Sequence, residues 1–367
     1  MSGAAAPHQP GLTPHRTGLT KSERYALGAV ALATALAGVA HYAAVDHVLA
    51  FALAAVALAG LAWIVSFATE QVGLRIGPAV TGFMHSTLGN LPEFFVVLFA
   101  LRAGELTVAQ TAILGSILVN ALLVLGLVIV AGARRTTDGV MRFSARLPND
   151  TATLLLLATF IIVLIGLTHA SRDGASHHTT TISVVGAVAI LLVYGVWARQ
   201  YLRSDDLATV GADKPRLGSA AAVRLLLAGA AASALVSEWF VDALTPAIDT
   251  LHISRAFAGL VIVAIAGNAV ENVTGIVMAG RGRADLAISV VKNSVAQIAA
   301  FVYPLLVLVS LLTVTTLTFA LAPVYIGALF GTAVIVWQIT GDGEATAFEG
   351  AALIATFVIL ATVAAFE

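Results

Sequence analysis

The stretches Gly-Asn-Leu-Pro-Glu at 89–93 and Gly-Asn-Ala-Val-Glu at 267–271 decide the fold of this chain. Each lies inside a long apolar run and places one carboxylate, Glu93 or Glu271, where charge is costly. An acidic side chain at the centre of a membrane-spanning helix costs about 3 kcal/mol or more, so it usually faces a pathway or a partner. The two stretches share the order Gly-Asn-x-x-Glu and start 178 residues apart. They therefore indicate an internal duplication that supplies one acid from each half.

The composition of the chain is that of a membrane protein. Hydrophobic residues make up 59% of the 367 residues and charged residues 11%, whereas a soluble domain carries about 25% charged residues. Apolar runs recur at about twenty residues, the length that spans ~30 Å of hydrocarbon. The net charge of −1 gives no sign of nucleic acid binding, and the lack of Cys excludes disulfides and thiolate metal sites. The run from Tyr25 is long enough to span, which favours a retained helix over a cleaved signal peptide.

These runs predict an all-α integral membrane protein with about 11 transmembrane helices. The predicted helices cover 25–44, 47–68, 76–101, 107–132, 149–169, 180–201, 220–246, 256–280, 285–311, 315–338 and 346–366. With the N-terminus in the cytoplasm, the cytoplasmic segments hold 15 Lys and Arg residues and the external segments 3. This asymmetry follows the positive-inside rule and places the C-terminus outside.

The predicted helices divide into two repeats of five behind an N-terminal helix. The predicted parts are the N-terminal tail with the first helix (1–46), repeat one (47–201), a cytoplasmic linker (202–219) and repeat two (220–367). Because five is an odd number, equivalent helices cross the membrane in opposite directions. Inverted repeats of this kind place a shared site near the bilayer midplane, at the interface between the halves.

Polar residues around the two acids predict a cation site built from both repeats. Asn and Glu at i and i+3 share a helical face, and the following helix of each half adds hydroxyl and amide groups. The predicted metal ligands are Glu93, Glu271, Asn90, Asn268, Ser116, Ser294, Asn120 and Gln297. Carboxylate, amide and carbonyl oxygens are the hard ligands that Ca²⁺ takes, six to eight at about 2.3–2.6 Å.

These residues resemble the Ca²⁺/H⁺ exchangers of the cation/Ca²⁺ exchanger superfamily. That family has two α-repeats, each with a GN-x-x-E helix followed by a GS-containing helix. Here the following helices read ILGSILVNALLVLG at 113–126 and KNSVAQIAAFVYPLL at 292–306. The resemblance implies that Glu93 and Glu271 bind both the metal ion and the protons, while the Asn, Ser and Gln residues assist. Repeat two departs from the family at Asn293, where Gly is usual.

Other polar residues in apolar runs can each be interpreted as structural or as functional. Lys292 lies about 10 Å from the cytoplasmic end of its helix, so we expect it to snorkel to the interface rather than join the site. His85 is a candidate proton relay on a face similar to that of Glu93, and a packed histidine is at least as good a reading. Glu238 and Asp242 are either a cation vestibule or the solvated end of a helix, and we favour the latter.

The sequence predicts a secondary active antiporter in the plasma membrane, which is the inner membrane in bacteria. Its substrates are Ca²⁺ and H⁺, exchanged by alternating access at a midplane site with two Glu residues. Na⁺/H⁺ or Na⁺/Ca²⁺ exchange on the same scaffold is the nearest alternative, and a channel or an intramembrane enzyme is a remote one. Neither a zinc-protease motif nor a nucleophile elbow is present, so we expect no enzyme activity. We also expect no cofactor, no nucleic acid partner, and the lipid bilayer as the surrounding medium.

Overall fold

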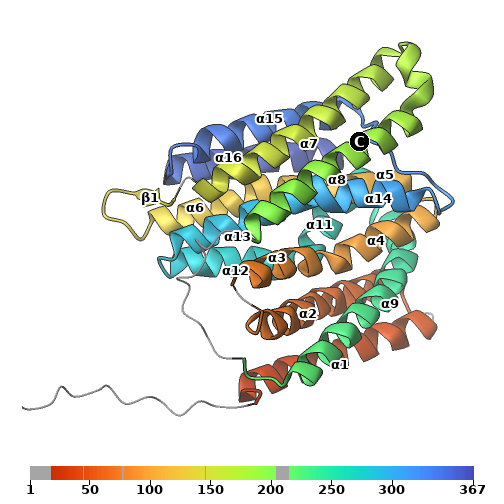
Figure 1. The fold of residues 1–367 in the computed structure, drawn as a ribbon. Helices are drawn as coiled ribbons and strands as arrows, with labels where there is room; N and C mark the ends of the chain where they lie inside the picture. Colours follow the sequence, from red (N-terminus) through yellow and green to blue (C-terminus); the bar gives the residue numbers. More distant parts are fainter. Residues whose placement is uncertain (1–17, 44, 77, 145, 204–214) are drawn as a thin grey trace, which may run out of the picture.

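The computed structural model describes residues 18–43, 45–76, 78–144, 146–203 and 215–367, without the side chains of 78, 79, 81, 82, 85, 86, 146–151 and 271. Helices dominate these residues (Figure 1). The elements before the linker are α1 (Lys21–Tyr42), α2 (His47–Gly73), α3 (Pro78–Gly89), α4 (Leu91–Arg102), α5 (Leu106–Leu118), the π-helix η1 (Val119–Val124), α6 (Leu125–Ala133), strand β1 (Val140–Arg142), α7 (Arg146–Ser171), the 3₁₀ helix η2 (Gly174–His178) and α8 (Thr179–Tyr201). The elements after it are α9 (Ser219–Leu251), α10 (Arg255–Phe257), the π-helix η4 (Ala258–Val263), α11 (Ala264–Gly267), α12 (Ala269–Gly280), α13 (Ala284–Gln297), the π-helix η5 (Ile298–Val302), α14 (Tyr303–Ser310), α15 (Pro323–Thr340), strand β2 (Glu344–Thr346) and α16 (Ala347–Ala365).

Several helices begin where a side chain caps the first backbone N–H groups. In α1 the backbone N–H of Glu23 donates to Thr20 Oγ1, and the Thr20 N–H donates back to the Glu23 carboxylate at 2.7 Å. Thr346 and Glu349 form the same capping box at the start of α16. Asp46 accepts two backbone N–H groups at the start of α2. Such caps fix where a helix starts and contribute about 1 kcal/mol each.

The apolar helices confirm the all-α membrane fold but not the count of eleven spans. Among the described residues, nine helices are long and apolar enough to cross a membrane, and one bent pair raises the number to ten. That bent pair is Arg255–Gly267 with Asn272–Gly280, which meet at 60°. The predicted helix over 76–101 is divided at Asn90 into α3 and α4, each of 12 residues.

The predicted helix over 315–338 starts too early. Residues 311–322 form an irregular connection, and α15 begins only at Pro323. Proline suits the first turn of a helix because its missing N–H has no intrahelical partner there. The connection is held instead by tertiary hydrogen bonds, among them one from the backbone N–H of Phe319 to Ser183 Oγ at 3.1 Å. The hydropathy pattern alone therefore places the start of this helix too early.

Irregular helical geometry recurs at corresponding places in the two halves. The chain breaks its helix at Asn90 and again at Asn268, which are 178 residues apart in the sequence. The next helix of each half contains a π-helical segment, η1 after α5 and η5 after α13. π-Helical segments are rare and concentrate at functional sites, so these matched interruptions mark the same region of both halves.

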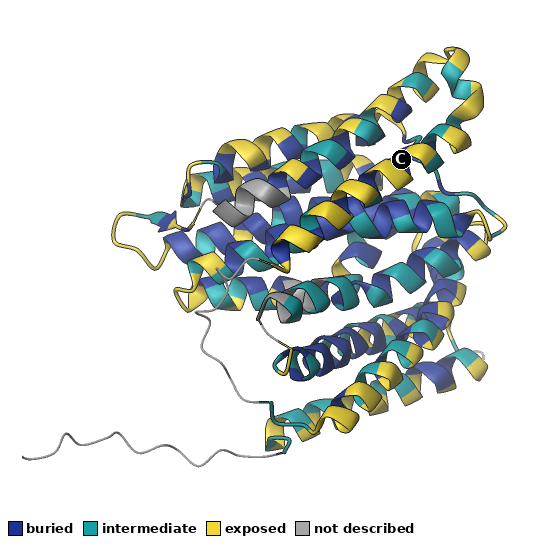
Figure 2. Cartoon of the chain, viewed as in Figure 1, coloured by how far each residue is buried: buried dark blue, intermediate teal, exposed yellow. Residues whose placement is uncertain are grey.

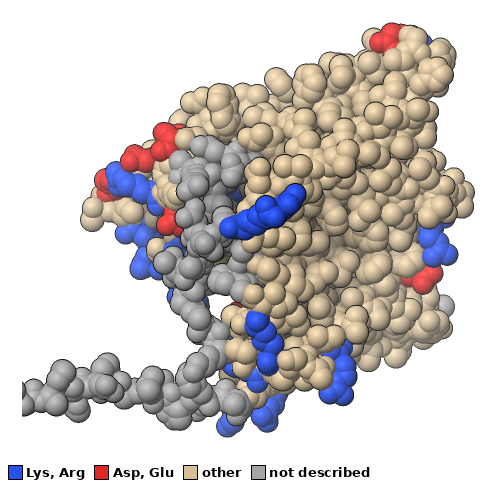
Figure 3. Space-filling view, in the orientation of Figure 1, with Lys and Arg blue, Asp and Glu red and all other residues tan. Residues whose placement is uncertain are grey.

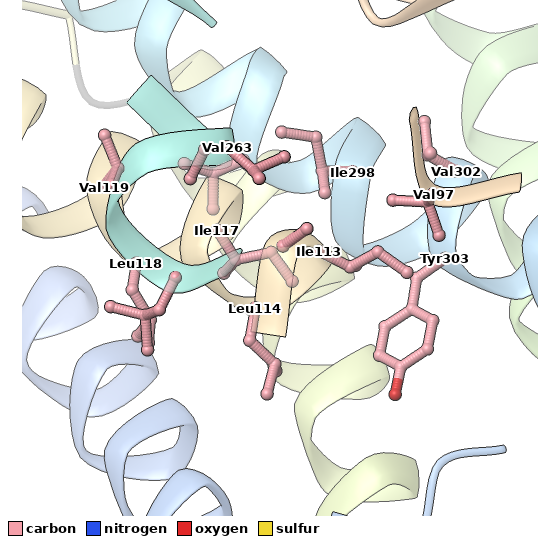
Figure 4. Packing of buried hydrophobic residues seen from close by; sticks show 14 of the residues in the cluster. Val97, Ile113, Leu114, Ile117, Leu118, Val119, Val263, Ile298, Val302 and Tyr303 are labelled. Carbon is pink, nitrogen blue, oxygen red and sulfur yellow. The ribbon is translucent and has the colours of Figure 1, made fainter. Parts of the chain in front are cut away.

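The centre of the molecule is formed by one helical span from each half. In the most apolar windows of α5–α6 and α13–α14, 83% and 72% of the residues are buried, against 22% in α1 and in α9. Figure 2 shows α1 and α9 at the periphery, with exposed residues along their outer faces. In Figure 4, Ile113 and Ile117 of repeat one lie close to Val263 and Ile298 of repeat two. The core thus packs the two halves against each other.

A short sheet joins two loops at one end of the bundle. Strand β1 pairs antiparallel with β2, with Val140 opposite Thr346. Arg142 bridges Asp138 at 2.7 Å and Glu344 at 3.2 Å, and its hydrogen bond holds the pKa of Asp138 below the usual range. Both pairs are exposed, so they add little to stability. On the face that Figure 3 shows, most Lys and Arg side chains gather at this end.

Candidate ion-binding site

The two helix breaks bring Asn90 and Asn268 to the starts of α4 and α12. Both residues have non-helical backbone angles and occupy the position before the first helical residue. Glu93 follows in the first turn of α4, where the helix dipole favours a carboxylate. Asn90 is 2% exposed, Glu93 1% and Asn268 2%. The sequence prediction that these residues lie deep inside the bundle agrees with the structure.

Four of the predicted residues form one hydrogen-bond network across the repeats. Asn268 Nδ2 donates to Ser116 Oγ at 2.8 Å and to the Ala264 carbonyl at 3.0 Å. Asn120 Nδ2 approaches Asn268 Oδ1 at 3.4 Å and Ser294 Oγ at 3.3 Å. All four polar residues are nearly fully buried. The network alternates between residues of the two halves and therefore links the halves at this depth.

Glu93 lies directly against the break of the opposite repeat. A Cβ built on Gly267 would stand 3.6 Å from Glu93 Cβ, with the other nearest atoms also belonging to Glu93. The acid of repeat one therefore packs on the Gly-Asn step that starts the second motif. Glu271 belongs to the first turn of α12, at the position equivalent to Glu93 in α4. Its side chain lies outside the described residues, and so does that of His85.

Gln297 is linked to a residue that the sequence analysis missed. Thr87 Oγ1 of α3 donates to the Phe83 carbonyl at 2.8 Å and lies 3.3 Å from Gln297 Oε1. Ser237 of α9 is a second missed residue, since its Oγ donates to the Pro92 carbonyl at 3.4 Å. A third is Asn272, a buried residue one turn after Asn268, whose Oδ1 has no partner among the described residues. In the sequence, Thr87 could have been found from the polar run His-Ser-Thr at 85–87, which interrupts an apolar helix just before Gly89.

The expectation that Lys292 snorkels to the interface is wrong. Its side chain is 5% exposed, and Nζ donates to Thr340 Oγ1 at 2.6 Å. Thr340 is the last residue of α15, where unpaired carbonyls favour a nearby cation. A lysine side chain snorkels only if its amine can reach water. Here α15 packs over Lys292 and separates its amine from water. Glu238 and Asp242 are exposed on α9, but α9 continues to Leu251, so they do not lie at the end of the helix as expected.

The chemistry of this site is that of a buried cluster of oxygen-bearing side chains contributed by both halves. Glu93 supplies a carboxylate, Asn268 and Asn120 supply amides, and Ser116 and Ser294 supply hydroxyls, all from buried positions. Such oxygen groups suit hard cations such as Ca²⁺ and Na⁺. The hydrogen bonds between them hold their positions in advance, as a selective site requires.

Comparison with known protein families identifies the family to which this chain belongs. The chain belongs to the sodium/calcium exchanger protein family, whose pattern matches residues 47–199 and 221–366. It is similar to the vacuolar calcium ion transporter of Schizosaccharomyces pombe, with 33% identity over 320 residues that cover 84% of this chain and 77% of that protein. It is also similar to the Ca²⁺/H⁺ antiporter ChaA of Bacillus subtilis, with 30% identity over 85% of this chain and 90% of that one.

Solved structures agree with the sequence relatives. The structure of native YfkE superposes with a TM-score of 0.78 and 26% sequence identity, covering 93% of this chain and all (100%) of that one. The H⁺/Ca²⁺ exchanger CAX, at 15% identity and a TM-score of 0.76, shares the fold. The predicted family and membrane fold are therefore confirmed.

Proposed function

We propose that this protein is a secondary antiporter that exchanges Ca²⁺ for H⁺ at the site between its two repeats. The observation that carries the proposal is the packing of Glu93 on Gly267, beside a polar network shared by both halves. The names of relatives support the choice of ions, because three bacterial relatives that match 85–88% of this chain are named Ca²⁺/H⁺ antiporters.

Competition for the carboxylates couples the two ions. In this proposal Glu93 and Glu271 together hold either one dehydrated Ca²⁺ or protons. Ca²⁺ and a proton compete for the same carboxylate oxygens, because a bound Ca²⁺ stabilises the ionised form of each group by its own charge, whereas a proton neutralises that group. The ion and the protons therefore exclude each other, which is the requirement for antiport.

The energetics allow a proton gradient to drive Ca²⁺ export. Each pH unit supplies about 1.4 kcal/mol per proton. We propose that at least two protons exchange for each Ca²⁺, one for each carboxylate. Alternating access then comes from movement of one repeat group against the other around the site.

We further propose a plasma membrane location with a cytoplasmic N-terminus and an external C-terminus. The gathering of Lys and Arg at one end of the bundle supports the orientation. Several relatives are named vacuolar transporters, so the membrane type rests on the bacterial relatives. We propose no resident cofactor, with Ca²⁺ and H⁺ as the transported ions.

Ion-driven proton flux in proteoliposomes tests this function. The purified protein is reconstituted with an acidic interior, and Ca²⁺, Na⁺ or K⁺ is added outside while an internal dye reports pH. We expect Ca²⁺ to dissipate the gradient and K⁺ to leave it intact, with protein-free liposomes as the control. Dissipation by Na⁺ but not by Ca²⁺ would replace the proposal with Na⁺/H⁺ exchange.

A further inference from the structure

An apolar groove of about 670 Å³ runs between α1, α2 and α9, away from the ion site. Its walls include Val30 and Ala35 of α1, Ile64 of α2, and Ala228 and Ala232 of α9. These three helices are candidate membrane spans, so the groove lies within the hydrocarbon region. Between Val30 and Trp239 the groove is lined largely by small residues of α1 and α9, such as Ala31, Ala35 and Ala228, which leave the space open.

The two ends of the groove differ in chemistry. At one end Gly38 packs on Trp239, and the ring of Tyr42 lies 5.8 Å from the same indole. Aromatic residues of this kind gather at membrane–water interfaces. At the other end the starts of α1 and α9 lie together, since Arg216 pairs with Glu23 at 2.6 Å. The helices therefore run side by side from a polar end to an aromatic end.

Basic side chains extend the groove beyond its polar end. Arg24 lies two turns before Ala31, a lining residue of α1, and Arg224 lies one turn before Ala228 on α9. These spacings keep each Arg on the helical face that lines the groove. Arg24 and Arg224 are exposed, as is Lys21 nearby. Figure 3 shows Lys and Arg side chains gathered in this corner of the molecule.

We propose that this groove binds an anionic phospholipid, with an acyl chain between α1 and α9 and the phosphate between Arg24 and Arg224. The lining of α1 starts at Val30, about 9 Å along the helix from Arg24 at 1.5 Å per residue, so an acyl chain that spans one leaflet of a hydrocarbon core ~30 Å thick reaches from the phosphate into the slot. An apolar slot that ends in clustered basic residues matches an amphiphile with a negative headgroup. A zwitterionic lipid matches the slot but not the charge.

The lipid would add to the direct packing that already holds these three helices together, of which α2 against α9 is the most extensive. α1 precedes the two segments that match the exchanger family, while α2 and α9 begin those segments. A lipid in the groove contacts all three, so its binding stabilises the folded protein, and a tighter-binding lipid stabilises it more. This inference does not depend on which ions the protein carries.

Lipid retention tests the site. The purified protein is delipidated and titrated with phosphatidylglycerol or phosphatidylcholine of the same acyl chains, and bound lipid is counted by native mass spectrometry. We expect selective retention of phosphatidylglycerol and a matching rise in Tm. At about 1 kcal/mol per basic side chain, Arg24→Gln and Arg224→Gln should each weaken retention about fivefold.

Two further variants separate charge from shape. Ala232→Phe fills the slot and should abolish retention of either lipid without removing a charge. Arg134→Gln with Arg135→Gln removes two exposed charges from the loop after α6 and should leave retention unchanged. Equal retention of both lipids, or equal losses in this control, would overturn the proposal. So would a dimer that Ala232→Phe converts to a monomer, because the occupant would then be a second copy of the chain.

Discussion

At the scale of single residues, Lys292 is a buried amine whose described partner is the Thr340 hydroxyl. Removing the partner of a buried polar group costs more than removing both groups, by about 1–3 kcal/mol. We therefore expect Thr340→Val to lower Tm clearly and Lys292→Met to change it little. The double variant should be more stable than Thr340→Val alone. A double variant that is less stable than either single one would show that the Lys–Thr contact is not a coupled pair.

Asn268 and Ser116 offer a second test at this scale. Asn268→Ala removes hydrogen bonds to Ser116, Asn120 and the Ala264 carbonyl. At about 1 kcal/mol each, this should raise the apparent KM for Ca²⁺ by tenfold or more, since 1.4 kcal/mol is about a factor of ten. Ser116→Ala removes one of these bonds and leaves the others in place, so it should change KM only about fivefold. Equal effects in the two variants would contradict the central position of Asn268.

The sequence could predict most site residues because a counterpart recurs in the other half, whereas Asn120 and Gln297 have no such counterpart and were predicted as polar groups on the following helix. Glu93 and Ser116 have counterparts 178 positions later, in Glu271 and Ser294. Thr87 has no such counterpart, because Ile265 stands at the equivalent position. The burial of Lys292 also needed the structure, since it depends on where α15 ends.

At the scale of elements, glycines decide how closely the helices of the site approach. A Cβ on Gly115 of α5 would stand 2.3 Å from the Leu260 carbonyl oxygen of η4. One on Gly267 would stand 3.6 Å from Glu93, which is ordinary contact. We expect Gly115→Ala to destabilise the protein by about 1–3 kcal/mol through overpacking, and Gly267→Ala to fold normally.

The measurement for both glycine variants is the yield of monodisperse protein and its Tm in detergent. A Gly115→Ala variant as stable as wild type would mean that α5 and η4 can move apart without a loss of stability.

Hydropathy predicted nearly all the helical regions, but it missed the irregular start of α15. It also did not predict the π-helical segments, because apolar residues fit α- and π-helical geometry equally well.

At the scale of the whole molecule, the orientation in the membrane is the first prediction to test. The loops before and after α7 lie at opposite ends of one 26-residue helix, which is about 39 Å long. A reporter fused after Arg135 should therefore be cytoplasmic, and one in the 171–178 loop external. Finding both reporters on the same side would contradict α7 as a span and the positive-inside assignment with it.

The central claim is that one carboxylate from each repeat, Glu93 and Glu271, carries both Ca²⁺ and protons. The most direct test is Ca²⁺-driven proton flux in proteoliposomes for Glu93→Gln and Glu271→Gln. Glu349→Gln is the control, because Gln also completes the capping box of α16. We predict that each site variant folds but loses exchange, while the control retains it. Exchange at the wild-type rate in either site variant would contradict the two-carboxylate mechanism.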